Sequence, residues 1–230
     1  MLYKNLFFDL DDTLWAFSLN ARDTYEEMYW KYGYDRYFDS FEHYYSLYQR
    51  RNLDLWAEYA DGKVTKEELN RQRYLYPLEA VGAGDSTLAK AYERDALTMI
   101  PTKSKLMPHA REVLEYLSRK YNLYTLSNGF KELQSHKMRS SGIDEYFKKV
   151  VLSDDIGILK PWPEIFHFAL STTQSELNNS LMIGDSWEND IVGAAGVGMH
   201  QVFYNLSGRI DLPFAPTYQI TDLKDLFNFL

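Results

Sequence analysis

Four short apolar runs in this sequence each end abruptly in polar residues, and this pattern constrains the fold more than any other feature. Runs of this length, bounded by polar and turn-forming residues, are typical of buried strands. The runs and the residues that end them are 2–10 with Asp9-Leu10-Asp11-Asp12-Thr13, 121–126 with Ser127-Asn128-Gly129, 150–152 with Ser153-Asp154-Asp155, and 181–183 with Gly184-Asp185-Ser186.

Segments with helical spacing lie between the later runs, at residues 110–119, 130–139 and 162–170. Strands therefore alternate with helices from about residue 109 onward, which predicts an α/β fold with a doubly wound, Rossmann-like parallel sheet. Parallel strands direct their carboxyl ends toward one edge of the sheet, where such folds bind ligands. We therefore expect polar residues far apart in the sequence to share one site.

Residues 15–100 depart from this alternation. The stretch is mostly helical in pattern and contains 12 of the 19 tyrosines, together with Trp15, Trp30 and Trp56. We interpret it as a helical domain inserted after the first strand, so that residues 1–14 and 101–230 form the α/β core. The tyrosines are expected chiefly to pack the inserted helices. A minority of these aromatic rings, or Trp15 and Phe17, are the alternatives for stacking on a nucleobase.

Composition excludes several classes of protein. A formal net charge of −8 disfavours nucleic acid and anionic membranes as partners. The absence of cysteine excludes disulfide scaffolds, thiolate nucleophiles and cysteine-ligated zinc. The first apolar run is interrupted by Asp9, and no stretch approaches the ~18 apolar residues of a membrane span. We therefore expect a cytoplasmic protein with no membrane partner.

Asp9 and Asp11 follow the first run two residues apart. Holding two carboxylates close together is costly unless a cation or a shared proton relieves their repulsion. Oxygen ligands without cysteine favour a hard cation, Mg²⁺ before Ca²⁺ or Zn²⁺. The alternative is that Asp12 and Thr13 cap the next helix and that the other two carboxylates are solvated.

Polar groups with possible chemistry also follow the later runs. Ser127-Asn128-Gly129 offers a hydroxyl, an amide and accessible backbone N–H groups, which suits an anion or forms a plain turn. Lys160 precedes Pro161 at a helix start, where a lysine is unusual, although most lysines are solvated surface residues. Asp185 and Asp190 add two carboxylates, with an ordinary N-cap as the alternative for Asp185. The glycine-rich segment 193–198 lacks the spacing of a nucleotide-binding loop and is interpreted as a helix C-terminus.

Taken in order, these pieces resemble the haloacid dehalogenase superfamily of phosphotransferases and hydrolases. The resemblance spans residues 9–190 and rests on Asp-x-Asp-x-Thr, hydrophobic-Ser-Asn, Lys-Pro and Gly-Asp-Ser-x-x-Asn-Asp. In that family a large insertion after the first motif is a helical cap of the C1 type, corresponding here to residues 15–100. The segments Asp-Asp-Thr-Leu-Trp and Lys-Pro-x-Pro-x-Ile-Phe are most similar to the YjjG-like 5'-nucleotidases within the superfamily.

The resemblance implies covalent catalysis. Asp9 would attack phosphorus and form an aspartyl-phosphate, and Asp11 would protonate the leaving oxygen and then deprotonate the attacking water. Ser127, Asn128 and Lys160 would hold the phosphoryl oxygens.

The same resemblance implies a bound Mg²⁺ ion. Its ligands would be the Asp9 carboxylate, the Asp11 backbone carbonyl and Asp185, supported from behind by Asp190 and Thr13. One lysine and Mg²⁺ would then offset the acidic side chains and the dianionic phosphoryl group.

The sequence thus predicts a Mg²⁺-dependent phosphomonoesterase that acts on a small phosphorylated metabolite, with a nucleoside 5'-monophosphate as the first substrate to consider. Phosphoglycolate and sugar phosphates are alternatives, and a phosphoglucomutase is a more distant one. Dehalogenases of this superfamily typically lack the second aspartate, so Asp11 favours phosphate chemistry over dehalogenation. A non-catalytic binding or regulatory module is the alternative outside enzymology, and the protein is expected to be a monomer or a weak homodimer.

Overall fold

A six-stranded parallel sheet forms the centre of one of the two units into which the chain folds. The computed structural model describes residues 2–230, of which residues 2–17 and 103–230 belong to this unit. The spatial order of the strands is β3-β2-β1-β4-β5-β6, and every adjacent pair is parallel. This confirms the predicted doubly wound α/β fold. The strands are β1 (Asn5–Phe8), β2 (Asn122–Ser127), β3 (Lys149–Leu152), β4 (Ser180–Gly184), β5 (His200–Tyr204) and β6 (Tyr218–Ile220).

The direction of winding reverses beside β1. From β1 the chain builds outward through β2 and β3, and it then returns to place β4 on the other side of β1. In this register Phe8 pairs with Thr125 on one side and with Ile183 on the other. The carboxyl ends of β1, β2 and β4 are therefore neighbours at the switch point, where ligands of such sheets bind.

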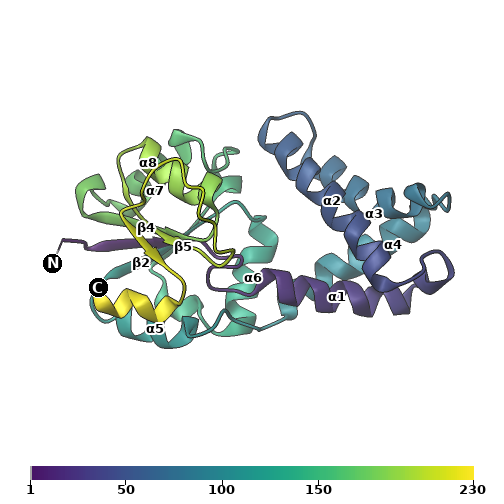
Figure 1. Cartoon of the computed structure of the whole chain (residues 1–230), viewed down its shortest axis with the longest axis horizontal. Coiled ribbons are helices and arrows are strands. Elements are labelled where there is room, and N and C mark those ends of the chain that lie inside the picture. Colours follow the sequence, from purple (N-terminus) through teal and green to yellow (C-terminus); the bar gives the residue numbers. More distant parts are fainter. Residues whose placement is uncertain (1) are drawn as a thin grey trace. The chain divides into compact units, whose positions relative to one another are not determined.

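Helices cover both faces of the sheet. Figure 1 shows α7 and α8 over one face and α5 on the opposite side. The α7 face is packed by Ile165 and Phe166, which contact Phe7 of β1 and Met182 of β4 in one buried cluster. The helices of this unit are α5 (Ala110–Leu117), α6 (Lys131–Ser141), α7 (Pro163–Thr173), α8 (Gly193–Gly196) and a π-helical segment (Trp187–Val192) that runs into α8.

Single-turn and short 3₁₀ helices complete the described secondary structure. They are Tyr34–Arg36, Ile100–Thr102, Asp144–Tyr146, Ser153–Asp155, Leu177–Asn179 and Leu223–Asn228.

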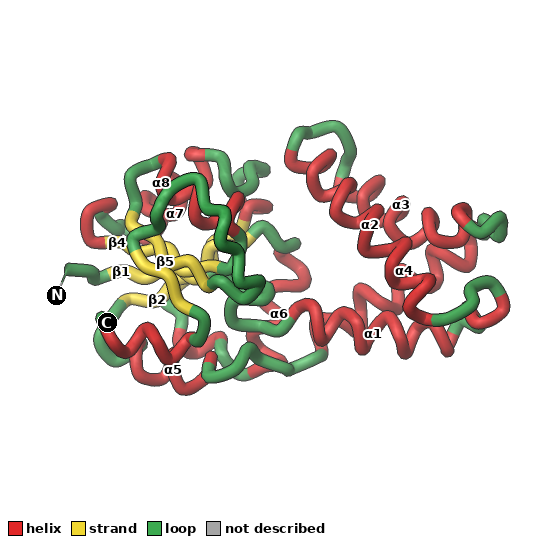
Figure 2. The backbone as a smooth tube through the Cα atoms, viewed as in Figure 1, coloured by secondary structure: helices red, strands yellow, loops and turns green. Residues whose placement is uncertain are grey.

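The second unit, residues 18–102, consists of helices and the loops between them (Figure 2). Its core is made largely of tyrosine. The Tyr25 hydroxyl is 2.6 Å from that of Tyr48, and the Tyr92 hydroxyl donates to the Tyr25 carbonyl at 2.9 Å. All three are almost fully buried. The helices are α1 (Phe17–Lys31), which begins at the last residue of the first unit, α2 (Phe41–Ala60), α3 (Lys66–Ala80) and α4 (Ser86–Met99).

The two units divide after residue 17 and after residue 102. The sequence places these boundaries after residues 14 and 100. Trp15 belongs to the first unit because it forms isolated β-bridges with Asp11 and Leu106, and its side chain is completely buried. None of the helices among residues 2–230 combines the length and apolar composition that crossing a membrane requires.

Two glycines of α8 allow a test of packing against the sheet. A Cβ atom on Gly193 would lie 2.6 Å from the buried ring of Phe166 and 3.0 Å from the Cα atom of Pro161, whereas one on Gly196 would meet nothing within 4 Å. We predict that Gly193→Ala lowers the free energy of unfolding by about 1–3 kcal/mol, because neither neighbour can move cheaply. Gly196→Ala is the matched control and should be neutral or slightly stabilising. Urea unfolding of both variants measures this, and equal stabilities would contradict the packing.

Candidate active site

Asp9 begins the loop after β1 and lies at the switch point of the sheet. Its backbone N–H donates to the Ile183 carbonyl of β4 at 2.9 Å, which continues the strand pairing by one residue. Only 8% of the residue is exposed. The Lys160 ammonium donates to its Oδ1 atom at 2.7 Å. A strand pairing and a buried ion pair therefore fix Asp9.

Lys160 is completely surrounded by acceptors from three parts of the chain. Besides Asp9, its ammonium donates to Oδ1 of Asp190 at 2.6 Å and to the carbonyl oxygen of Leu126 in β2 at 2.7 Å. Only 2% of the residue is exposed. Lys160 is thus not a solvated surface lysine, and all three hydrogens of its ammonium are directed to acceptors.

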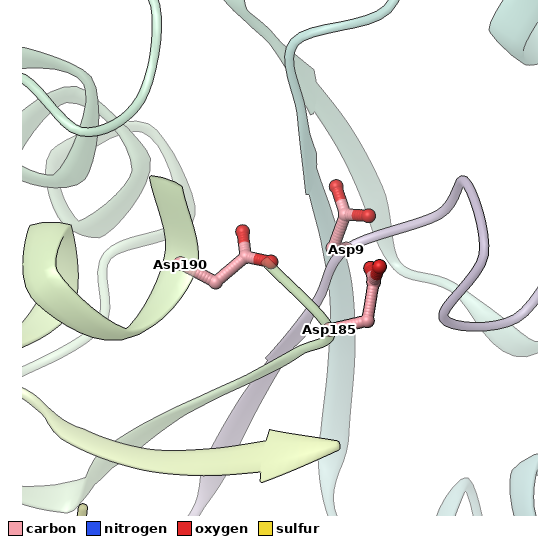
Figure 3. A group of neighbouring side chains, drawn as sticks. All are labelled: Asp9, Asp185 and Asp190. Carbon is pink, nitrogen blue, oxygen red and sulfur yellow. The ribbon is translucent and has the colours of Figure 1, made fainter. Parts of the chain in front are cut away.

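Three carboxylates converge at this edge of the sheet. Asp9 and Asp185 follow neighbouring strands, and Asp190 extends toward them from the π-helical segment (Figure 3). One oxygen from each lies within 4.8 Å of the others. The sequence predicts that Asp9 and Asp185 share one edge, and the structure places them there.

Local contacts orient Asp185 and Asp190. Thr13 is fully buried, and its hydroxyl donates to Oδ1 of Asp185 at 2.9 Å while accepting the Asp185 backbone N–H at 3.1 Å. The Ser186 N–H donates to Oδ2 of Asp190 at 3.0 Å. A Cβ atom on Gly184 would lie 2.1 Å from that same Oδ2 atom, so the approach of Asp190 requires a glycine at this position.

These contacts exclude two of the alternatives that the sequence left open. Thr13 does not cap a helix, because its hydroxyl is committed to Asp185 and α1 begins only at Phe17. Asp185 is not an N-cap either. The cap of the following π-helical segment is Ser186, whose hydroxyl accepts from the Asn189 N–H.

Burial and neighbouring charges shift the pKa values of Asp9, Asp185 and Lys160. Burial raises the pKa of Asp9 well above its ordinary value, and the nearby Asp190 and Asp185 add to this effect against the opposing ion pair with Lys160. Burial, followed by repulsion from Asp190, raises the pKa of Asp185 to about 7, although the Thr13 hydrogen bond opposes the shift. Burial alone would lower the pKa of Lys160, but Asp190 and Asp9 outweigh it and raise that pKa.

The charge balance indicates what the cluster can hold. When all groups are ionised, three carboxylates and one ammonium leave an excess of two negative charges in a buried space. A divalent cation would cancel this excess, and an all-oxygen donor set suits a hard ion such as Mg²⁺. The carboxylate oxygens of Asp9 and Asp185 are therefore suitable ligands for a metal ion. Asp190 lies next to them and bonds to Lys160.

The end of β2 supplies the neutral polar groups of the site. Ser127 Oγ accepts the Gly129 N–H at 3.2 Å. The Asn128 side chain forms two hydrogen bonds with the backbone of Lys160, donating to its carbonyl at 3.0 Å and accepting its N–H at 2.8 Å. Asn128 therefore fixes the backbone from which the Lys160 side chain extends.

Asp11 has partners that the sequence analysis missed. The Lys137 ammonium of α6 contacts both carboxylate oxygens of Asp11, at 2.7 and 2.9 Å, and Gln134 of the same helix donates to Oδ2 at 2.9 Å. Both helix residues are buried. No sequence signal identifies these two residues, because the burial of Gln134 and Lys137 on a largely polar helix is visible only in the folded structure.

Comparisons with known proteins agree with this geometry. A solved structure of the protein YfnB from Bacillus subtilis, described as bound to magnesium, superimposes with a TM-score of 0.89 at 26% identity over 100% of this chain and 99% of that one. The pyrimidine 5'-nucleotidase YjjG of Escherichia coli is 28% identical over 100% of this chain and 99% of its own length. A glyceraldehyde 3-phosphate phosphatase of Pyrococcus furiosus is 31% identical over 99% and 92%.

The family model for haloacid dehalogenase-like hydrolases matches residues 3–198. That range contains Asp9, Ser127, Lys160, Asp185 and Asp190, which are the residues that the fold gathers at the switch point. The chain therefore belongs to the haloacid dehalogenase-like hydrolase family.

Proposed function

We propose that this protein is a Mg²⁺-dependent phosphomonoesterase that hydrolyses a small phosphorylated metabolite through an aspartyl-phosphate intermediate. One observation carries the proposal: Asp9 and Asp190 pair with the single buried ammonium of Lys160 and Asp185 lies beside them, so the cluster has two negative charges in excess when all its groups are ionised. The site therefore has a place for a divalent cation beside a fixed carboxylate nucleophile. A dianionic phosphoryl group would then lie beside the positive charges of the cation and of Lys160, which separate it from the carboxylates.

Asp9 and Asp185, with the Asp11 backbone carbonyl, would hold the metal ion. When bound, Mg²⁺ would offset the negative charge of the phosphoryl oxygens. Asp190 and Thr13 would support these ligands through the contacts that they make with Lys160 and Asp185. These assignments rest on donor chemistry and on the family to which the chain belongs.

The reaction would proceed in two displacements. A carboxylate oxygen of Asp9 attacks phosphorus, the bond to the leaving oxygen breaks, and Asp11 gives its proton to that oxygen. A water molecule then attacks the aspartyl-phosphate and transfers a proton to Asp11. Inorganic phosphate leaves, and both aspartates return to their starting states.

Three groups would bind the phosphoryl oxygens. Lys160 supplies a buried positive charge and would turn one ammonium hydrogen from its present acceptors, Asp9, Asp190 and the Leu126 carbonyl, to a phosphoryl oxygen. Ser127 supplies a hydroxyl at the end of β2. For Asn128 we propose contact through the backbone N–H, because its side-chain amide is already bonded to the backbone of Lys160. The Ser127 hydroxyl and the Asn128 backbone N–H are held in place by the end of β2, and fixed donors of this kind stabilise charge on the transferring group with little reorganisation.

Nucleoside 5'-monophosphates are the first substrates to test, since YjjG is named a pyrimidine 5'-nucleotidase and matches this chain over its whole length. The Pyrococcus furiosus relative, named for glyceraldehyde 3-phosphate, favours a phosphorylated sugar as the second candidate. The helical unit of residues 18–102 is proposed to act as the cap that selects the substrate.

We predict that Asp9→Asn lowers phosphate release from an aryl phosphate by at least about a thousandfold, because the amide is a poor nucleophile. Asp144→Asn, an exposed aspartate in a 3₁₀ helix, is the matched control and should keep full activity. The assay is run with Mg²⁺ and with a chelator, and the chelator should abolish wild-type turnover. Undiminished turnover by Asp9→Asn would exclude this residue as the nucleophile.

Metal-free stability provides a test that needs no turnover. The raised pKa of Asp185, about 7 against an unfolded value of ~3.9, means that the folded state binds more protons than the unfolded state between these pH values. Stability without metal should therefore fall as pH rises through 7. We predict that, in the presence of a chelator, the Tm of Asp185→Asn minus the Tm of the wild type is at least about 2 °C larger at pH 8 than at pH 5.

In this test Mg²⁺ should raise the Tm of the wild type at pH 8 and leave Asp185→Asn nearly unchanged, because the variant has lost a metal ligand. Asp144→Asn again serves as control and should follow the wild-type curve. Parallel pH profiles for wild type and Asp185→Asn, with equal responses to Mg²⁺, would refute the metal site.

A phosphate-release screen identifies the substrate. We expect pyrimidine nucleoside 5'-monophosphates to give higher kcat/KM values than sugar phosphates or phosphoglycolate. A ranking with nucleotides near the bottom would overturn the nucleotidase assignment while leaving the phosphatase chemistry intact. Phosphoryl transfer between positions of a sugar phosphate, without net phosphate release, would instead indicate a mutase.

A further inference from the structure

Helix α6 delivers two buried polar side chains to Asp11. Gln134 is fully buried and Lys137 is 3% exposed, although both are residue types that usually face solvent. They lie three positions apart and therefore on the same face of the helix. Burying an amide and an ammonium is costly unless each finds specific partners, so their partners indicate why they are there.

Lys137 is bound on two sides. Its ammonium contacts both oxygens of Asp11 at 2.7 and 2.9 Å, and it lies 4.7 Å from the ring centroid of Trp15 and 5.1 Å from that of Phe17. Aromatic faces attract a cation at these distances. The ammonium thus lies against the two aromatic rings while it contacts both oxygens of the Asp11 carboxylate.

The loop that carries Asp11 also carries one of those rings. The Trp15 backbone N–H donates to the Leu10 carbonyl at 2.8 Å, and the Asp12 backbone N–H donates to the Trp15 carbonyl at 2.8 Å. Trp15 and Asp11 therefore belong to one closed turn. Lys137 contacts this turn at the Asp11 carboxylate and at the Trp15 indole. These two contacts limit rotation of the Asp11 side chain.

Gln134 joins Asp11 to Ser127. Its amide nitrogen donates to Oδ2 of Asp11 at 2.9 Å and to Oγ of Ser127 at 2.7 Å, which uses both hydrogens of one NH₂ group. Ser127 Oγ accepts this bond and the Gly129 N–H, so its own hydrogen remains for donation elsewhere. A Cβ atom on Gly129 would lie 2.0 Å from the Gln134 amide nitrogen, so glycine is needed there for this approach.

We propose that Gln134 and Lys137 are positioning residues that orient the Asp11 carboxyl group for proton exchange with the leaving oxygen and the attacking water. This inference rests on the proposed function, because it assigns them to the acid and base step of that reaction. Gln134 has a second task, which is to direct the Ser127 hydroxyl toward the phosphoryl group. Both residues act through Asp11 and Ser127, and neither exchanges a proton with the substrate or the attacking water itself.

Leaving-group dependence separates this role from a structural one. A good leaving group departs without a proton, whereas an alkyl alcohol needs a general acid. The later attack of water on the aspartyl-phosphate also uses Asp11 and is common to all substrates, so the comparison is made in kcat/KM, which reports on the first displacement alone. We expect Lys137→Met to lower kcat/KM for an alkyl phosphate by about a hundredfold and kcat/KM for 2,4-dinitrophenyl phosphate by less than about fivefold. Lys137→Arg, which keeps the charge, should recover part of the loss.

The two positioning residues should also differ from each other. Gln134→Met should show the same selective loss of kcat/KM and also raise the inhibition constant of inorganic phosphate, because the Ser127 hydroxyl loses the hydrogen bond that directs it. Lys137→Met should leave this inhibition constant nearly unchanged. Lys131→Met is the matched control, since this exposed lysine of the same helix pairs with Asp155 away from Asp11, and it should behave as wild type.

Asp11→Asn is measured beside these variants as the reference. Equal losses on both substrates for Lys137→Met and Gln134→Met, with a selective loss for Asp11→Asn, would overturn the positioning role and leave the proposed function standing. If Asp11→Asn itself shows no selectivity, the acid role of Asp11 is wrong. Circular dichroism and Tm are recorded for each variant, and Lys137→Arg provides the test if Lys137→Met does not fold.

Discussion

The ion cluster around Lys160 is the constraint on which the rest of the α/β unit depends. Its ammonium bonds Asp9, Asp190 and the Leu126 carbonyl, and so joins the ends of β1 and β2 to the segment after β4. Removing one of the carboxylate partners of Lys160 would destabilise the fold, because it would leave a buried charge without compensation. Folding therefore brings together groups that are far apart in the sequence, and it does so at the point where the sheet reverses its winding.

Repulsion among the three carboxylates of this cluster is only partly compensated. One ammonium cannot neutralise three carboxylates, and burial raises the pKa values of Asp9 and Asp185 accordingly. Perturbed ionisation of this kind is typical of functional sites, because the groups are held ready for a charged ligand that completes the balance. The α/β unit supplies the framework for this, with Thr13 and Ser186 orienting two of the carboxyl groups.

The sequence predicts the edge of the sheet better than it predicts the helices beside it. Asp9, Ser127 and Asp185 follow buried strands, and parallel topology alone brings such residues together. Lys160 and Asp190 were identified through their motifs, because no local pattern says where a lysine before a helix directs its side chain. Gln134 and Lys137 were missed since α6 is largely polar, and their burial depends on contacts with the Asp11 loop that form only in the folded chain. The short strands β5 and β6 were not predicted either.

Gly184 has a consequence that reaches beyond its own position. Its missing side chain leaves the volume that the Asp190 carboxylate occupies, so residues 184 and 190 share one space. A methyl group at 184 would displace the Asp190 carboxylate, and the Lys160 ammonium would then keep only Asp9 and the Leu126 carbonyl as acceptors. The two positions are therefore coupled across the turn that separates them: a larger residue at 184 is compatible with the fold only alongside a smaller, uncharged one at 190, and with a different partner for the lysine.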